Sequence, residues 1–148
     1  MTEDNYDRIM QVNLKSATFV AKIFAKNCSK NGVVVNVSSQ TSFVPLPQHT
    51  SYCISKAGMD MLTKMMALEL GKKNIRVNSV NPTVVMTELG KSAWSDPVKA
   101  ETVLSKIPLK KFAEVNEVVK PILFFLSDDS SMVNGDCLQI DGGFVACN

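Results

Sequence analysis

Residues 33–39 read Val33-Val-Val-Asn-Val37 followed by Ser38-Ser39, and this stretch carries the strongest structural signal in the chain. Valine is β-branched and favours extended backbone. An almost continuous apolar run of this length is typical of a strand that helices cover on both faces of a parallel sheet. Because Asn31-Gly32 marks a turn just before it, we predict a buried strand at Val33–Val37 with both serines beyond its carboxyl end.

A long helix is expected on each side of this strand. Apolar residues recur at helical spacing from about Asp4 to Cys28 and again from about Ser51 to Leu70, where Gly71 ends the pattern. The second helix is apolar on two sides, with Ile54, Ala57, Met61, Met65 and Leu68 on one and Met59, Leu62, Met66 and Leu70 on the other. Such a helix needs two covering surfaces, and we expect the sheet to supply one and a partner protomer the other.

The alternation of strand and helix continues to the end of the chain. The further predicted elements are a strand at Ile75–Val80, a mixed segment at 83–111, a helix at about Asn116–Leu126 and a strand at Cys137–Ile140. Pro121 falls inside the predicted helix, so we expect a late or kinked start. This order predicts an α/β fold with a three-stranded parallel sheet and flanking helices.

Ligands of such sheets bind beyond the carboxyl ends of the strands. Ser39, Pro82 and the Gly142-Gly143 turn all fall at or just past those ends. The chemistry of the protein is therefore expected there.

Composition and charge argue against several classes of protein. The 148 residues are 45% hydrophobic and 20% charged, with a formal charge of +2, which favours one domain over residues 1–148. The basic residues are scattered, so no nucleic-acid partner is predicted. The N-terminus does not resemble a secretory signal, and the densest apolar run, at 121–126, is too short to cross a bilayer. We expect a cytoplasmic protein with no membrane partner.

A metal site is not expected. The four cysteines, at positions 28, 53, 137 and 147, form no Cys-x-x-Cys pair, and the chain has one histidine. A zinc site needs more ligands than these. Without a secretory signal, we expect reduced thiols.

Tyr52, Lys56 and Ser39 are the candidates for chemistry. The first two are four residues apart at the start of the predicted helix and share one face. A free phenol has a pKa near ~10, and a neighbouring ammonium favours the phenolate and lowers that pKa. The Ser39 hydroxyl could bond a carbonyl oxygen while Tyr52 donates a proton. The alternatives are a surface tyrosine packed on a lysine stem and a serine that caps a turn.

Together these motifs resemble those of the short-chain dehydrogenases/reductases. The matching stretches are Val12-Asn13-Leu14, Asn36-Val-Ser-Ser39, Tyr52-Cys-Ile-Ser-Lys56, Asn78-Ser-Val-Asn-Pro82, Leu126-Ser-Asp128 and Asp141-Gly142-Gly143. Within the family, Tyr52-Cys53, Asn81–Thr87, Trp94–Pro97 and Ile107–Phe112 are similar to the L-xylulose/dicarbonyl reductase group. The resemblance implies the C-terminal part of a Rossmann-like, doubly wound parallel sheet.

The resemblance implies catalytic roles for Asn13, Ser39, Tyr52 and Lys56. Tyr52 would be the general acid in reduction, and Ser39 would orient and polarise the substrate carbonyl. Lys56 would bind the nicotinamide ribose beside Tyr52 and lower the pKa of that tyrosine. Asn13 would hold a water that links Lys56 to solvent, the alternative being an amide satisfied by local partners.

The resemblance also implies a cofactor loop at Pro82, Val85 and Thr87. Backbone groups near Val85 would pair with the nicotinamide carboxamide, and the Thr87 hydroxyl would lie beside it or beside the pyrophosphate. Glycine is usual after the proline, and here Thr83 takes its place. The alternative is a plain turn after a strand. The implied cofactor is NADP(H), with NAD(H) not excluded.

His49 and Trp94 are candidate substrate contacts beside Ser39. His49 lies in the loop before Tyr52, and Trp94 lies in the segment that forms the substrate lid in the family. The alternatives are a solvated histidine and a tryptophan packed under a loop. The implied substrate is a small ketone, such as a ketose or an α-dicarbonyl compound.

The sequence lacks the glycine-rich turn of a dinucleotide site. Its seven glycines form neither Gly-x-Gly-x-x-Gly nor the family's Gly-x-x-x-Gly-x-Gly. We therefore interpret the chain as the catalytic and substrate side of one domain, without its cofactor-binding half. The Val33–Val37 strand would then expose an apolar edge, and the chain alone would bind NADPH weakly or not at all.

Two functions remain open at this point. One is NADPH-dependent carbonyl reduction that needs residues beyond this chain for full activity. The other is a non-catalytic isoform that joins a homo-oligomer, such as a homotetramer, through the helices at 4–28 and 51–70. A serine hydrolase built on Ser39, His49 and Asp60 is disfavoured, because the chain has no Gly-x-Ser-x-Gly elbow.

Overall fold

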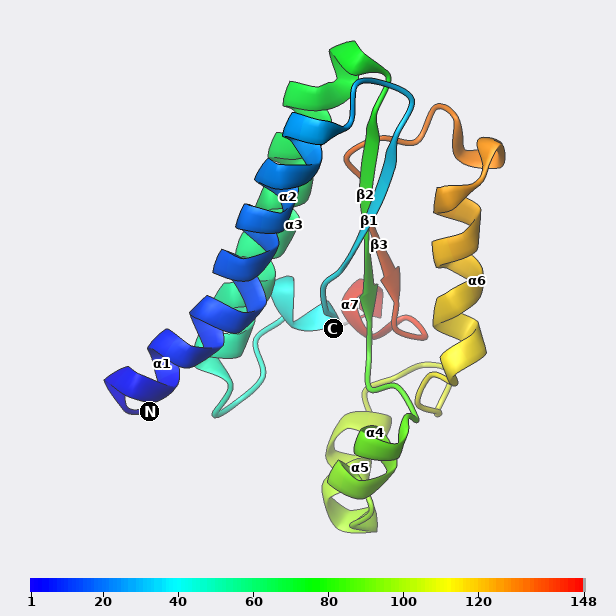
Figure 1. Ribbon diagram of the computed structural model, residues 1–148. Coiled ribbons are helices and arrows are strands. Elements are labelled where there is room, and N and C mark those ends of the chain that lie inside the picture. Colours follow the sequence, from blue (N-terminus) through cyan, green and yellow to red (C-terminus); the bar gives the residue numbers. More distant parts are fainter. Residues whose placement is uncertain (148) are drawn as a thin grey trace.

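The computed structural model describes residues 1–147 and has an α/β architecture (Figure 1). Its elements are α1 (Glu3–Met10), η1 (Gln11–Lys15), α2 (Ser16–Asn27), β1 (Val33–Val37), η2 (Gln40–Ser42), α3 (Thr50–Leu70), η3 (Gly71–Lys73), β2 (Arg76–Pro82), α4 (Glu88–Ala93), α5 (Pro97–Leu104), α6 (Val115–Leu126), η4 (Asp128–Ser130), β3 (Cys137–Ile140) and α7 (Phe144–Cys147). The segment η1 is π-helical, and η2, η3 and η4 are short 3₁₀ helices. No helix within residues 1–147 is long and apolar enough to span a bilayer.

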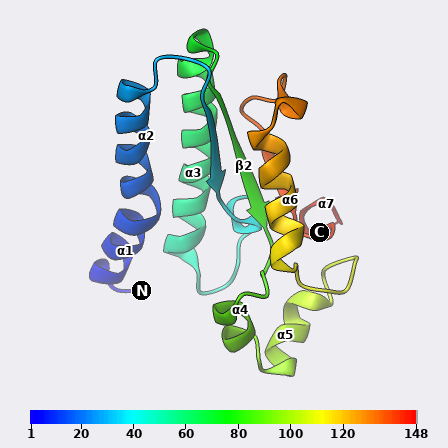
Figure 2. The ribbon, with the colours of Figure 1, turned by 45° about the vertical axis from the view of Figure 1, so that its right-hand side comes forward.

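The sheet has the order β1-β2-β3 with all strands parallel, which confirms the predicted class. Helices α2 and α3 lie on one side of the sheet and α6 lies on the other, as two views of the ribbon agree, while α1 extends away from the strands alongside α3 (Figures 1 and 2). The strands point toward α4 and α5, which lie beyond their carboxyl ends (Figure 1). In the described sheet β1 pairs only with β2, so its outer edge is open, as predicted.

Apolar clusters on both faces hold the layers together. On the α3 face, Met66, Ala67, Leu70, Ile75 and Val77 are buried. On the α6 face the buried residues are Val80, Ala113, Val118 and Phe125. A third cluster packs α5 against the segments around Phe112 and Phe144. Burial of such side chains contributes most of the stability of a domain this size.

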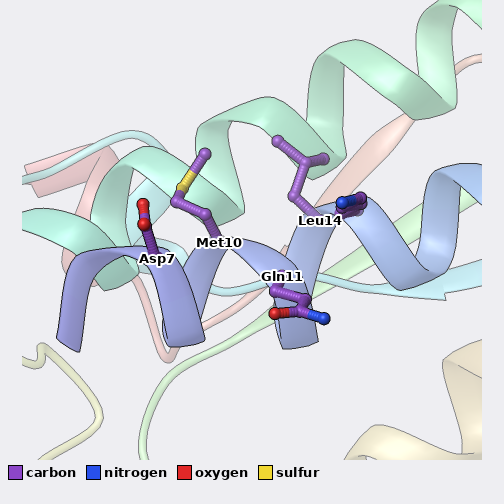
Figure 3. A pocket seen from close by; sticks show the side chains of 5 residues that line it. Asp7, Met10, Gln11 and Leu14 are labelled. Carbon is purple, nitrogen blue, oxygen red and sulfur yellow. The ribbon is translucent and has the colours of Figure 1, made fainter. Parts of the chain in front are cut away.

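The predicted helix at 4–28 is continuous but contains a π-helical turn at η1, where the Ser16 amide donates to the Gln11 carbonyl. Leu14 of this turn packs closely on α3, because a Cβ added at Gly58 would lie 2.5 Å from its Cδ2. Figure 3 shows Met10 and Leu14 pointing toward α3. A hollow of about 440 Å³ beside this turn holds none of the predicted site residues.

The start of α6 differs from expectation. The helix begins at Val115, not late, and runs through Pro121. A capping box fixes this start, because Glu114 and Glu117 each bond the other's backbone amide. The prediction of a late start was wrong because these caps lie a full turn before the proline and satisfy the amides of the first turn.

Candidate active site

Ser39 lies just past the carboxyl end of β1 and is buried. Its extended backbone caps η2, and its Oγ accepts hydrogen bonds from the Thr41 amide at 3.2 Å and the Thr41 hydroxyl at 3.0 Å. A hydroxyl that accepts twice still has its own proton to donate. Ser39 therefore caps a turn, as the alternative interpretation had it, and retains a donor for a second partner.

Tyr52 and Lys56 lie in the first turns of α3, at the carboxyl end of the sheet. The Lys56 Nζ lies 5.6 Å from the centroid of the Tyr52 ring and donates to the Val37 carbonyl at 2.9 Å. The Ser39 hydroxyl lies close enough to the Tyr52 phenol to lower its pKa as a hydrogen-bond partner. The structure thus brings together a phenol, an ammonium and an alcohol from two separate chain elements.

The pKa of Tyr52 departs from the sequence-based expectation. Burial raises the pKa of this phenol above its usual value, the contact with Ser39 opposes the rise, and electrostatic repulsion from Cys53 adds to it. Burial also lowers the pKa of Lys56, and the charge of Asp60 opposes that change. We expected Lys56 to lower the pKa of Tyr52, but burial dominates, and the ammonium lies over the ring bonded to Val37. Tyr52 is therefore a protonated phenol at neutral pH in this structure.

Asn13 lies in the π-helical turn and contacts α3. Its Nδ2 donates to the Ser55 Oγ at 3.0 Å, and that hydroxyl donates to the Tyr52 carbonyl at 2.7 Å. The amide thus has a local partner next to the Tyr52–Lys56 turn. π-helical turns are often found at functional sites.

The predicted cofactor loop leaves the end of β2 and turns toward α4. The Val84 carbonyl accepts from the Ala113 amide and the Met86 amide donates to the Ala113 carbonyl, so the amide of Val85 takes no part in this bridge. The Thr87 hydroxyl caps α4 by accepting from the Gly90 amide at 3.1 Å.

Thr83 stands where the family usually has glycine. Pro82 pairs with Ile140 in the sheet register, and the Thr83 amide donates to the Ile140 carbonyl at 3.1 Å. The Thr83 Oγ1 is buried and has no hydrogen-bond partner within residues 1–147.

The two predicted substrate residues have mainly local contacts. His49 is exposed before α3, and its Nδ1 lies 2.8 Å from the Pro47 carbonyl. Trp94 packs against Phe112 with tilted rings whose centroids are 5.6 Å apart, and the Lys99 Nζ lies 4.8 Å from the centroid of the Trp94 ring. Trp94, at the end of α4, is therefore packed against the apolar cluster that joins α5 to Phe112.

Sequence reasoning missed the buried polar contacts of Asp60. Its carboxylate accepts from Asn81 at 2.8 and 3.1 Å and from Ser79 at 3.4 Å. It therefore faces β2 and not His49, which also argues against the hydrolase triad that the sequence already disfavoured. The signal that could have predicted these contacts was an acidic residue one turn after Lys56 on a helix expected to be buried. No group of three or more metal-ligating side chains occurs in the part of the chain that the structure describes.

Comparisons with known proteins agree with this geometry. A family model described as enoyl-(acyl carrier protein) reductase matches residues 1–145. Human L-xylulose reductase is 53% identical over 150 residues, covering 99% of this chain and 62% of the relative. Chicken (Gallus gallus) D-erythrulose reductase is 48% identical over 148 residues, covering 98% and 60%. The chain therefore spans about three fifths of the length of these curated relatives.

A solved structure gives the same picture. A putative 2-deoxy-D-gluconate 3-dehydrogenase from Agrobacterium tumefaciens with bound NADP superimposes with a TM-score of 0.95 at 31% identity, covering 99% of this chain and 61% of that one. With a Tyr-x-x-x-Lys helix, a strand-end serine and a family match along nearly its whole length, the chain belongs to the short-chain dehydrogenase/reductase family of oxidoreductases.

Proposed function

We propose that this chain carries the catalytic residues of an NADPH-dependent reductase that converts a small ketose or α-dicarbonyl compound to an alcohol. The observation that carries the proposal is the convergence of Ser39, Tyr52 and Lys56 at the carboxyl end of the sheet. The relatives support the substrate class, since L-xylulose and D-erythrulose are both ketoses.

Tyr52 donates its phenolic proton to the carbonyl oxygen of the substrate. The raised pKa keeps that proton on the phenol at neutral pH, where an acid is needed. The Ser39 hydroxyl bonds the same oxygen and polarises the carbonyl. NADP(H), when bound, supplies hydride to the carbonyl carbon.

Lys56 fits a nicotinamide ribose. An ammonium has three N–H donors, and the bond to Val37 uses one of them, which leaves two for ribose hydroxyls. A hydroxyl ligand there would lie beside the Tyr52 ring. After transfer, Tyr52 regains a proton through Lys56 and a water held near Asn13, where the π-helical turn widens the helix.

The loop at Pro82, Val85 and Thr87 fits the carboxamide of the same cofactor. The Val85 amide is not used by the bridge to Ala113, so it can donate to an amide oxygen. Thr87 already accepts from Gly90, and its hydroxyl proton remains available to a ligand. NADP in the Agrobacterium structure supports this choice of cofactor.

His49 and Trp94 border the substrate in this proposal. If His49 Nδ1 donates to Pro47, its Nε2 is an acceptor for a substrate hydroxyl. Trp94, held by Phe112 and Lys99, presents a ring edge to the sugar chain.

We also propose that the outer faces of α2 and α3 join copies of the protein. The exposed apolar side chains on these faces are Phe19, Val20, Ile23, Ile54, Met61, Met65 and Leu68, joined by Val12 of the adjoining η1, each between 43% and 77% exposed. They lie away from the residues that pack on the sheet, as expected for a helix apolar on two sides. Leu68→Lys should weaken association in sedimentation, while Met132→Lys, at a distant exposed methionine, should not.

The catalytic proposal is tested by a matched pair of tyrosine variants. The chain has two tyrosines, Tyr6 and Tyr52. Activity is followed as loss of NADPH absorbance with L-xylulose, D-erythrulose and a dicarbonyl, in a chimera with the part of human L-xylulose reductase that this chain does not cover. We expect Tyr52→Phe to lose at least about 100-fold in kcat, the scale of general acid catalysis, and Tyr6→Phe to be unaffected. Equal activity of the two variants would refute the proposal.

A further inference from the structure

The interface between the sheet and α3 changes character along the helix. Its C-terminal half is apolar, with Met66, Ala67 and Leu70 packed on the sheet. The part before it, up to Thr63, makes side-chain hydrogen bonds that include Ser38 Oγ to the Lys56 carbonyl at 3.1 Å, Asn36 Nδ2 to Thr63 Oγ1 at 2.8 Å and Asn81 Nδ2 to Asp60 Oδ2 at 2.8 Å. Hydrogen bonds add little net stability but fix direction. The half of α3 that carries Tyr52 and Lys56 is therefore held by directional contacts.

Asp60 is the charged member of this set. It is 7% exposed, and its oxygens accept from Asn81 and Ser79. Neither ion pair found within residues 1–147 involves it. A carboxylate is costly to bury unless its neighbours hydrogen-bond it. Movement of Asn81 away from Asp60 would therefore cost free energy, and this cost holds the Asn81 side chain in place.

The contact continues from Asn81 to Ser39. The same Asn81 amide nitrogen donates to the Ser39 carbonyl at 3.2 Å and to the Ser42 hydroxyl at 2.9 Å. Ser42 also donates to the Ser39 carbonyl, at 2.8 Å. A network of hydrogen bonds thus runs from Asp60 on α3, through β2, to the main chain of Ser39 beyond β1.

We propose that Asp60 is a positioning residue of the active site, which acts through Asn81 to hold Ser39 where its hydroxyl meets the Tyr52 phenol. Its importance for reduction rests on the proposed function, whereas the positioning itself can be measured without turnover. A positioning role of this kind accounts for a buried carboxylate at the contact between α3 and β2.

The other charged and titratable groups around Asp60 lie on α3 and at β3. Lys56 is one turn before it, and the charge of Asp60 raises the pKa of that lysine against the effect of burial. From β3, burial raises the pKa of the Cys137 thiol, and Asp60 and Asp136 add to the rise while Lys64 opposes it. Replacement of Asp60 by Asn therefore removes one negative charge from between these groups.

The test uses the phenolate absorbance of Tyr52 in a Tyr6→Phe background, where it is the one remaining tyrosine. Asp60→Asn should displace Ser39, weaken its bond to Tyr52 and raise the pKa of Tyr52. Loss of a negative charge alone would lower that pKa, so the sign separates positioning from simple electrostatics. In a Ser39→Ala background, Asp60→Asn should no longer raise the pKa of Tyr52, because no serine hydroxyl remains to be displaced and only the loss of charge acts.

Asp136→Asn is the matched control, because it removes an equal charge near Cys137 and should not move Tyr52. The proposal is overturned if Asp60→Asn leaves Tyr52 unchanged, or shifts it equally with and without Ser39. Circular dichroism at each pH reports whether the fold persists. The ring-carbon NMR signal of Tyr52, recorded at neutral pH, also compares the effect of Asp60→Asn with and without Ser39, and it does not require exposure to high pH.

A milder variant covers the case in which Asp60→Asn does not fold. Ser42→Ala deletes a hydroxyl that bonds both Ser39 and Asn81, and it should raise the pKa of Tyr52 by a smaller amount. No shift in this variant would also overturn the proposal. Failure of the proposed reductase function would appear as absent turnover with this coupling intact, so the two failures are distinguishable.

Discussion

Gly90 stands where α4 approaches the predicted cofactor loop most closely. A Cβ at this position would lie 2.0 Å from the Val85 carbonyl oxygen and 3.1 Å from its carbonyl carbon. That oxygen is backbone and already accepts from the Thr87 amide at 2.8 Å. An alanine at position 90 would therefore have to push α4 and the loop apart by roughly 1 Å or more to reach van der Waals distance.

The cost of Gly90→Ala follows from two opposing effects. Overpacking that forces backbone shifts costs about 3 kcal/mol at the upper end of its usual range. Alanine in a helix gains up to about 1 kcal/mol over glycine. We therefore expect a net loss of about 2 kcal/mol of unfolding free energy, or several degrees in Tm at about 2–4 °C per kcal/mol. Equilibrium unfolding in urea, with NADPH affinity of the chimera as a second readout, measures this loss.

Gly71→Ala is the control for Gly90→Ala. The nearest atom to a Cβ at Gly71 is the Asn134 Nδ2, at 3.7 Å, and the Gly71 φ of −56° suits alanine. This change should be neutral or stabilise the fold by about 0.4–1 kcal/mol. If Gly90→Ala proved as stable as Gly71→Ala, the close approach of α4 to the Val85 carbonyl would be refuted.

Three further predictions concern the titration of Tyr52 and the stability of the fold. In a single-tyrosine chain, Ser39→Ala should raise the pKa of Tyr52 and Cys53→Ser should lower it, since these groups act in opposite directions on the phenol; the reverse order of midpoints would contradict this. Because its folded-state pKa is raised, Tyr52 contributes full stability below pH 10.0, its ordinary value, and that contribution should fall as pH rises above it. Arg76→Lys should cost about 2 kcal/mol in denaturant unfolding, because Arg76 donates to the Phe125 and Ser127 carbonyls at the end of α6 and lysine cannot reproduce this fork; a loss below about 0.5 kcal/mol would show these bonds to be dispensable.

The strands were predictable from sequence because their signals are local. The extent of β1 agrees with the structure, and the ends of β2 and β3 coincide with Asn81-Pro82 and with the Asp141 turn. Burial was predicted less well, because β1 at the open edge is only half-buried, whereas β2 between two strands is buried at every residue after Arg76 and shows no alternation. The start of α6 was missed, since the mutual bonds of Glu114 and Glu117 outweigh the proline signal. The π-helical turn at η1 was also missed, because the apolar pattern of residues 4–28 is nearly the same for α and π geometry.

Sequence predicted which side chains meet in the candidate site, but not the environment that surrounds them. Tyr52 and Lys56 share a helix face, and Ser39 follows a strand, so their meeting could be inferred. The direction of the Tyr52 pKa could not, because it depends on burial created by segments far away in sequence. The role of Asn81 was hidden for the same reason: its amide joins Asp60, on the preceding helix, to Ser39, beyond the preceding strand.

The division of α3 into an apolar half and a polar half explains how this fold combines stability with accuracy. Apolar packing tolerates small slides of a helix, because its energy depends on area and not on direction. The half around Met66 and Leu70 can therefore supply stability without fixing the helix at atomic precision. Hydrogen bonds to Ser38 and Asn81 at the other half weaken steeply with distance and angle, so they fix the turn that carries Lys56. A proton transfer needs that accuracy, since a displacement of about 1 Å can cost roughly 100-fold in rate.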